Sequence, residues 1–130
     1  MNSMKRAIAV LLFGFALLAG VIGAQAGTTF KTVKAGETVL VHTQSFVGGV
    51  PPGLKSPKLY IVQPQNGKIT TRKSRKRERG QQLTVFEFYY TSKKGFKGVD
   101  RAEAGISMNM IIRGKPAWAN ISDKLVLQVR

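Results

Sequence analysis

Six basic residues crowd into eight consecutive positions near the middle of the chain: Arg72, Lys73, Arg75, Lys76, Arg77 and Arg79. In an extended strand, alternate members of such a tract share a face a few ångströms apart, where they repel one another unless an anion lies between them. The planar arginine fork suits the oxygens of phosphate, sulfate and carboxylate groups. The tract therefore predicts a polyanion-binding hairpin.

A second group of cations, Lys93, Lys94 and Lys97, follows the next predicted strand. These lysines would extend the anion-binding surface if their loop lies at the same end of the domain as the basic tract. The competing interpretation of the tract is a solvated hairpin whose charges protect a sheet edge from aggregation. The sequence supports both interpretations equally.

The loop with the lysines also holds four residues that are typical of turns: Gly95, Phe96, Gly98 and Asp100. The glycines permit positive φ, Phe96 can plug the edge of a core, and Asp100 can accept backbone N–H bonds. A calcium site at Asp100 and Glu103 is the alternative, but calcium takes about six to eight oxygens. The chain has only six acidic residues. We therefore expect a scaffold role for the loop, and no metal or other cofactor.

The sequence contains few residues of the types and spacings that enzymes use for catalysis. The one histidine, His42, falls on the strand face that we expect to meet solvent, and there is no cysteine. No serine lies in a G-x-S-x-G elbow, and no paired carboxylates indicate acid–base chemistry. Trp118 could stack on a sugar, but anchoring a core or loop is the commoner use of tryptophan. The sequence predicts a protein that is not an enzyme.

The first 26 residues have the three parts of a secretory signal peptide. Lys5 and Arg6 precede an uncharged apolar run, and Ala24-Gln25-Ala26 suits signal peptidase. An uncleaved anchor is the alternative because the run approaches the length that spans a bilayer. Its three glycines weaken a stable helix, so cleavage is favoured. We expect an exported protein, periplasmic or extracellular.

Residues 27–130 are the predicted mature domain, which carries 19 of the 21 basic residues and all six acidic ones, a net charge of +13. Such a field attracts polyanions. Outside the cytoplasmic membrane these include anionic glycans, lipopolysaccharide and membrane surfaces, and a protein partner is also open. Export argues against nucleic acid. A domain of this size buries roughly 65% of its unfolded surface, so packing can stabilise it without disulfides.

Apolar residues in the mature domain recur with a period of two, which predicts strands rather than helices. The expected strands cover residues 28–33, 38–43, 58–63, 68–74, 83–91, 101–113 and 124–129, with loops at 45–57 and 114–122. The expected core residues are Phe86, Phe88, Tyr90, Ala102, Ala104, Ile106, Met108, Met110, Ile112, Leu125, Leu127 and Val129. About seven short strands favour an antiparallel β-sandwich, with a small barrel as the alternative.

The stretch FEFYYTSKKGFKGVDRAEAGI, residues 86–106, resembles the repeat core of bacterial immunoglobulin-like and cadherin-like extracellular modules. In those modules an aromatic strand precedes a G-F-x-G-x-D turn and another alternating strand. This chain departs from the pattern because no aromatic residue follows Asp100 closely, and it holds one copy rather than tandem repeats. The resemblance implies an immunoglobulin-like β-sandwich that acts as a spacer or binding domain.

The sequence therefore predicts an exported, non-enzymatic binding module that recognises an anionic envelope or extracellular polymer, or a partner protein, through a basic hairpin. The alternative is a structural or assembly component of the cell envelope or surface, whose charge serves only solubility and adhesion.

Overall fold

A computed structural model describes residues 27–48 and 52–130 of the chain. The predicted signal peptide, residues 1–26, lies outside the described residues, as do residues 49–51 of the predicted loop at 45–57. Every regular element in the described part is a β-strand. Within that part, no helix is long and apolar enough to span a membrane.

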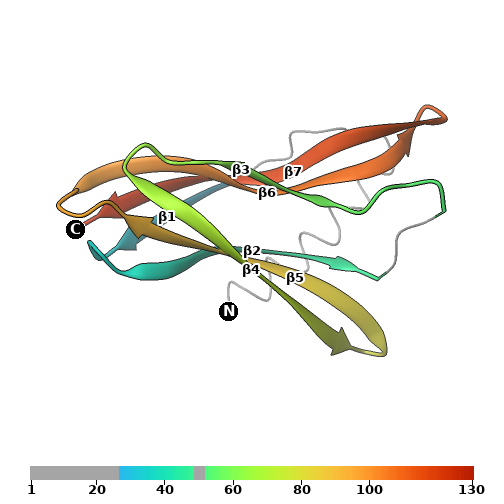
Figure 1. Cartoon of the computed structure of the whole chain (residues 1–130), viewed down its shortest axis with the longest axis horizontal. Coiled ribbons are helices and arrows are strands. Elements are labelled where there is room, and N and C mark those ends of the chain that lie inside the picture. Colours follow the sequence, from blue (N-terminus) through green and yellow to red (C-terminus); the bar gives the residue numbers. More distant parts are fainter. Residues whose placement is uncertain (1–26, 49–51) are drawn as a thin grey trace.

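The described residues form seven strands: β1 (Thr28–Val33), β2 (Thr38–Val47), β3 (Lys58–Val62), β4 (Gly67–Glu78), β5 (Gln81–Ser92), β6 (Gly98–Ile112) and β7 (Lys115–Val129). They build a four-stranded sheet in the order β1-β7-β6-β3 and a three-stranded sheet in the order β2-β5-β4. The two sheets face each other in a sandwich-like arrangement (Figure 1). The predicted all-β fold of about seven strands is confirmed.

The expectation that every pair of strands is antiparallel is wrong at one edge. β1 runs parallel to β7, with Thr29 opposite Leu125, whereas the other paired strands are antiparallel. The turn after β1 carries the chain across to the other sheet, so β1 and β2 do not form a hairpin. β1 instead pairs with the last strand, and the Arg130 N–H donates to the Val33 carbonyl at 3.0 Å.

The core lies between the sheets and follows the predicted alternation. Phe86, Phe88 and Tyr90 of β5 are buried. The facing sheet buries Ala102, Ala104, Ile106, Met110, Leu125, Leu127 and Val129, and Met108 and Ile112 pack partly buried against them. Burial of apolar surface contributes about 25 cal/mol per Å². This interior is therefore the main stabilising element in a chain without disulfides.

Two long hairpins replace shorter elements that the sequence suggested. β4 pairs with β5 without interruption as far as Glu78 opposite Gln81, and β6 pairs with β7 as far as Ile112 opposite Lys115. The predictions that β-structure ends near Ser74 and that residues 114–122 form a loop are wrong. A long neighbouring strand satisfies the backbone groups of these segments, whatever side chains they present to solvent.

Each hairpin closes through an Arg-Gly dipeptide in which both residues have positive φ. The φ angles are 50° and 76° at Arg79 and Gly80, and 52° and 78° at Arg113 and Gly114. Two central residues of this kind define a type I′ turn, whose twist matches that of the strands it joins. The tips of both hairpins are therefore tight turns.

A bulge in β2 reverses the expected direction of His42. The pairing of β2 with β5 shifts register between Leu40 and His42, and Val41 and His42 are both buried. One extra residue in a strand moves the side chains that follow it to the opposite face. The prediction that His42 faces solvent is therefore wrong.

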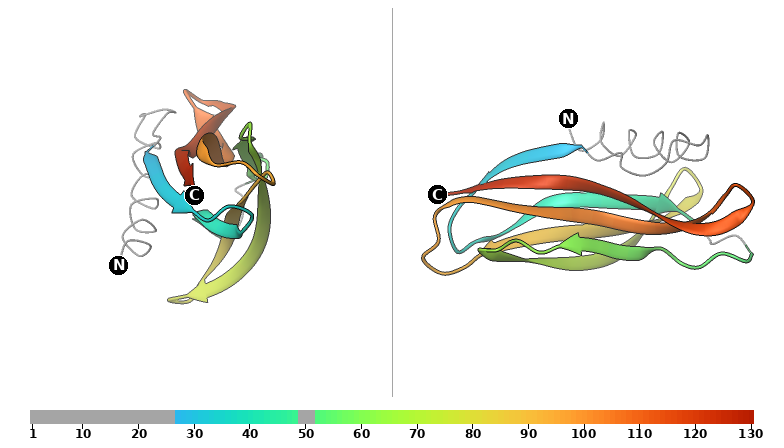
Figure 2. Two further views of the ribbon diagram at one scale, coloured as in Figure 1. Left: turned by 90° about the vertical axis from the view of Figure 1, so that its left-hand side faces the viewer. Right: turned by 90° about the horizontal axis from the view of Figure 1, so that it is seen from above.

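The tips of the two hairpins lie at the same end of the molecule but diverge from each other (Figure 1). The loops that follow β1, β3 and β5 gather at the opposite end, beside the C-terminus. The end-on view in Figure 2 shows β4 at the margin of the molecule. This arrangement fixes where the predicted site residues lie.

Candidate functional site

The basic tract forms the second half of β4 and the turn that follows it. Arg72, Lys73, Arg75, Lys76 and Arg77 lie in the strand, and Arg79 is the first residue of the turn. β4 is an edge strand because the three-stranded sheet places it beside β5 alone. All six side chains are exposed. We call this set, Arg72, Lys73, Arg75, Lys76, Arg77 and Arg79, the basic edge.

The cations of the basic edge occupy both faces of β4. Lys73, Arg75 and Arg77 share the face of the buried Ile69, and they are exposed because the opposing hairpin diverges at this end (Figure 1). Arg72 and Lys76 point to the outer face, by the alternation of a strand. Neighbours on one face stand about 7 Å apart along the strand. The basic edge is therefore a line of charges rather than a single anion pocket.

The cations of the basic edge have no salt-bridge partner within the described part of the chain. There, no lysine or arginine forms a salt bridge, and the contact between a basic and an acidic side chain joins His42 Nδ1 to Asp123 Oδ2 at 3.6 Å. Glu87 lies across the sheet from Arg72, but its carboxylate accepts the Tyr89 hydroxyl at 3.0 Å. That hydrogen bond raises the pKa of Tyr89. The charges of the basic edge are thus available to an external anion.

The Lys73 side chain of the basic edge contacts an aromatic ring of the sheet. The Lys73 ammonium lies 6.0 Å from the centroid of the Phe86 ring, at the outer limit of a cation–π contact. Because Phe86 is buried and Lys73 is exposed, this contact places the Lys73 ammonium at the rim of the core.

The structure separates Lys93, Lys94 and Lys97 from the basic edge. Their loop follows β5 at the end of the molecule opposite the Arg79-Gly80 turn (Figure 1). Twelve residues of β5 separate that loop from the hairpin tip, about 37 Å of extended chain. The lysine loop therefore does not lie at the same end of the domain as the basic edge, and its three lysines do not extend it.

A shallow pocket does lie near the lysine loop. Its lining is Gln63, Gly67, Lys68, Thr91, Ser92 and Lys93. The polar groups there already serve the fold: the Ser92 hydroxyl accepts the Gly36 N–H at 3.0 Å, and the Gln63 amide bonds to the backbone of Ile69. The pocket therefore offers few unsatisfied groups to a ligand.

Asp100 is a buried hydrogen-bond acceptor that joins β6 to its neighbours. It accepts the Tyr90 hydroxyl at 2.7 Å and the backbone N–H groups of Asn66 at 3.2 Å and Arg101 at 3.2 Å. Glu103 interacts instead with Ser122, at 3.5 Å. The two carboxylates that a calcium site would need are thus engaged separately. Among the described residues, no group of three or more metal-binding side chains occurs.

The remaining residues of the loop adopt turn geometry. Gly95 and Gly98 have φ angles of 83° and 134°, which side chains with a Cβ rarely adopt. Phe96 packs partly buried against the core. The loop thus has a conformational reason for each of these residue types.

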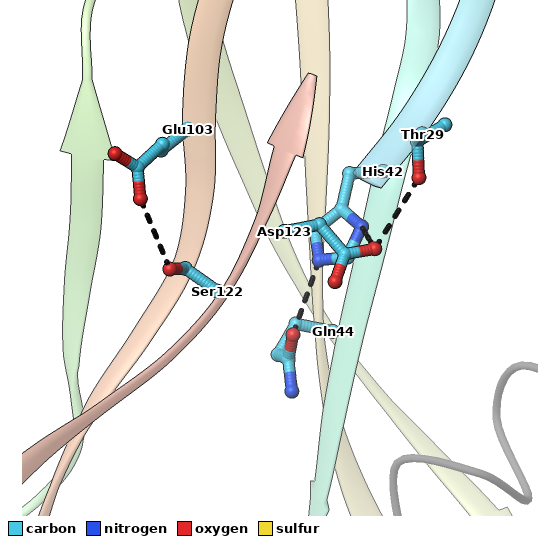
Figure 3. Close-up of polar contacts among 6 residues, drawn as sticks. All are labelled: Thr29, His42, Gln44, Glu103, Ser122 and Asp123. Carbon is cyan, nitrogen blue, oxygen red and sulfur yellow. Dashed lines mark hydrogen bonds and ion pairs between the residues drawn. The ribbon is translucent and has the colours of Figure 1, made fainter. Parts of the chain in front are cut away.

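A group of four polar side chains that the sequence did not indicate lies between the sheets (Figure 3). His42 Nδ1 lies 3.6 Å from Asp123 Oδ2, and Nε2 lies 3.1 Å from Gln44 Oε1. The Thr29 hydroxyl donates to the same Asp123 oxygen at 3.3 Å. This group links β1, β2 and β7. It was missed because it depends on the β2 bulge, which has no local sequence signal.

The His42–Asp123 pair resembles part of a hydrolytic triad, but the nearby serine does not complete it. In a triad the second imidazole nitrogen faces a nucleophilic hydroxyl. Here that nitrogen faces the Gln44 amide. Ser122 precedes Asp123 in β7, so the two side chains point to opposite faces, and the Ser122 hydroxyl faces Glu103 (Figure 3). The geometry is that of an interior polar contact.

Trp118 lies on the outer face of the larger sheet and is 40% exposed. The Lys58 ammonium stands 4.7 Å from the centroid of its ring. The Trp118 ring is therefore not a core anchor. Its face is not fully available for stacking on a ligand either, because the Lys58 ammonium already lies over it.

Comparison with known proteins finds no family model, no curated protein and no solved structure that matches this chain.

Proposed function

We propose that the chain is an exported, non-enzymatic binding module that recognises an anionic envelope or extracellular polymer, or a partner protein, through the basic edge. The observation that carries this proposal is a line of six exposed cations, five on an edge strand and one in the turn that follows it, none of them in a salt bridge within the described residues. Lysine and arginine charges that are paired internally bind external anions weakly. Unpaired charges in a line instead favour a multivalent anion.

An immunoglobulin-like classification is part of the proposal, and the strand order supports it. In immunoglobulin constant-type domains one sheet holds strands ABED and the other CFG. If β2 to β7 are labelled B to G, the smaller sheet reads BED and the larger one GFC, with the first strand moved to the edge beside G. The stretch that resembles bacterial immunoglobulin-like modules, residues 86–106, covers most of the E and F strands in this labelling.

Export is proposed on the sequence of residues 1–26. It determines which polyanions the protein meets, namely anionic glycans, lipopolysaccharide and membrane surfaces. The intact mass of the exported chain tests this part of the proposal, because cleavage after Ala26 leaves a protein that begins at Gly27. A mature protein that still begins at Met1 would contradict it.

The binding proposal is tested with two variants of equal charge. The first replaces Arg75, Lys76 and Arg77 by glutamine, and the second replaces Lys93, Lys94 and Lys97. Each removes three exposed positive charges. Heparin affinity is measured at several salt concentrations. Release of counterions makes the logarithm of affinity fall with the logarithm of salt by about 0.7 to 0.9 per charge contact.

In the variant with glutamine at Arg75, Lys76 and Arg77, we expect the slope of log affinity against log salt to fall in magnitude by about 2 to 3. This variant should also bind heparin at least tenfold more weakly than the native chain at physiological salt. The second variant should behave nearly like the native chain. Equal losses in both variants would indicate only a diffuse field. No measurable binding by the native chain at physiological salt would favour a structural or assembly component whose charge serves solubility and adhesion.

A further inference from the structure

The outer edge of β4 carries a row of backbone groups whose direction can be assigned. The Gln63 side chain bonds to this edge at Ile69: its Oε1 accepts the Ile69 N–H at 2.8 Å, and its Nε2 donates to the Ile69 carbonyl at 3.1 Å. Both backbone groups of Ile69 therefore point away from β5. Ile69 and its partner Tyr90 form one of the pairs that exchange no hydrogen bonds within the ladder.

The backbone N–H and C=O groups of every second residue of β4 point outward in the same way, as far as the hairpin tip. The β4–β5 register runs without a shift, and antiparallel pairs alternate between bonded and non-bonded. The residues whose N–H and C=O point outward are therefore Thr71, Lys73, Arg75 and Arg77. Within the described part of the chain, no strand lies on that side of β4. Beyond Ile69, four successive positions are open to a new strand.

The contact with Gln63 shows what kind of group this edge accepts. A primary amide has the donor and acceptor of a peptide group, and Gln63 uses both on one residue of β4. An extended polypeptide that continues past this point would make the same paired bonds to the next four positions. A glycan cannot do so, because its backbone consists of sugar rings and glycosidic oxygens, and any acetamido groups are substituents that lack the spacing of a peptide strand.

The side chains indicate the composition of the partner. Residues directly opposite on neighbouring strands have Cβ atoms about 5 Å apart, so like charges there are unfavourable and opposite charges favourable. A second copy of β4 would place cations against cations. An acidic segment with carboxylates at alternate positions would instead place them against Lys73, Arg75 and Arg77 on one face, or against Arg72 and Lys76 on the other.

We propose that an acidic, extended segment of a partner protein adds to the edge of β4 as a further strand, bonded to Thr71, Lys73, Arg75 and Arg77. This inference rests on the proposed anion-binding role of the basic edge and names the class of its partner. Backbone bonds supply the alignment of the segment, and its alternating carboxylates supply the match to the basic edge.

The test compares Arg75→Pro with Arg75→Gln. Both remove the same charge, but proline also removes the outward N–H and places its ring at the edge. Because that N–H does not bond to β5, proline is tolerated there as it is in edge strands generally. The probes are a synthetic ten-residue peptide of alternating threonine and glutamate, and heparin as a polyanion without a peptide backbone.

We expect Arg75→Pro to bind the peptide at least tenfold more weakly than Arg75→Gln does, while the two variants bind heparin equally. Equal affinities for the peptide would overturn strand addition but leave the proposed anion binding intact. If neither probe depends on the basic edge, as judged by replacing Arg75, Lys76 and Arg77 with glutamine, the proposed function itself fails.

A second measurement does not depend on the folding of the proline variant. Strand addition should slow amide hydrogen exchange in the native chain at Thr71, Lys73, Arg75 and Arg77, when the peptide is present. The alternate residues already bond to β5 and should change little. Peptide binding that leaves those four amides exchanging as fast as before would overturn the inference.

Discussion

Replacement of Tyr90 by phenylalanine tests the buried contact that joins β5 to β6. The Tyr90 hydroxyl donates to Asp100 at 2.7 Å, and neither residue is more than 3% exposed. A hydrogen bond to a charged group contributes about 1.5–3 kcal/mol. We therefore expect Tyr90→Phe to lower the free energy of unfolding at neutral pH by about 2 kcal/mol. The loss should leave the fold and the exposed basic edge unchanged.

The same contact predicts a pH dependence with a definite sign. Burial of the ring and, secondarily, the Asp100 carboxylate raise the pKa of Tyr90 above its ordinary value of 10.0. Above that pH the unfolded chain loses the Tyr90 proton while the folded chain keeps it, so stability falls as pH rises. The slope is about 1.4 kcal/mol per pH unit. The variant lacks this contribution.

Urea unfolding of both proteins between about pH 7 and pH 11 measures the effect. The difference in unfolding free energy should be about 2 kcal/mol up to pH 9 and about 0.6 kcal/mol at pH 11. Subtraction of the variant removes the contributions of the lysines and the other two tyrosines, which both proteins share. A difference that stays constant to pH 11 would refute the assignment of a buried Tyr90–Asp100 contact.

Three further predictions concern the turns, the interior polar group and metal. Arg113→Asn should raise the free energy of unfolding by about 0.5–1 kcal/mol in thermal unfolding, because asparagine tolerates the positive φ of a type I′ turn. Arg113→Ala is the control for the lost charge, and it should not stabilise the chain. His42→Leu should lower the urea midpoint by the equivalent of about 1–2 kcal/mol, because Asp123 and Gln44 lose their polar contacts with the imidazole, and an unchanged midpoint would contradict the role assigned to these contacts. Millimolar calcium should leave the melting temperature unchanged, since Asp100 already bonds to Tyr90 and two backbone N–H groups; a rise of several degrees would contradict this.

The parts of the fold that depend on local alternation were predictable. Phe86, Phe88 and Tyr90 are buried as expected, and so are Leu125, Leu127 and Val129. A period of two in residue type is a direct consequence of the pleat. Predictions from this signal therefore needed no knowledge of which strands are neighbours.

The parts that depend on distant partners were not predictable. The parallel pairing of β1 with β7 joins the two ends of the domain, and the burial of His42 follows from a bulge in its pairing with β5. Composition suggested that regular structure ends near Ser74, yet β4 continues to Glu78 because β5 is equally long. In each case the bonding of a neighbouring strand outweighs the local signal.

The features of the candidate site also fall into those that the sequence predicts and those that depend on strand pairing. Composition alone identified the basic tract, but its position on a sheet edge depends on the strand order. The distance between this tract and Lys93 depends on the full length of β5. The outward backbone groups of β4 became assignable only through the Gln63 contact at Ile69.

The central claim is that the basic edge, and not the overall charge, recognises an anionic partner. Its most direct test is the salt dependence of heparin binding by the two charge-matched glutamine variants. We predict a smaller slope and at least tenfold weaker binding when Arg75, Lys76 and Arg77 are replaced, and near-native behaviour when Lys93, Lys94 and Lys97 are replaced. Identical curves for the two variants would contradict the claim.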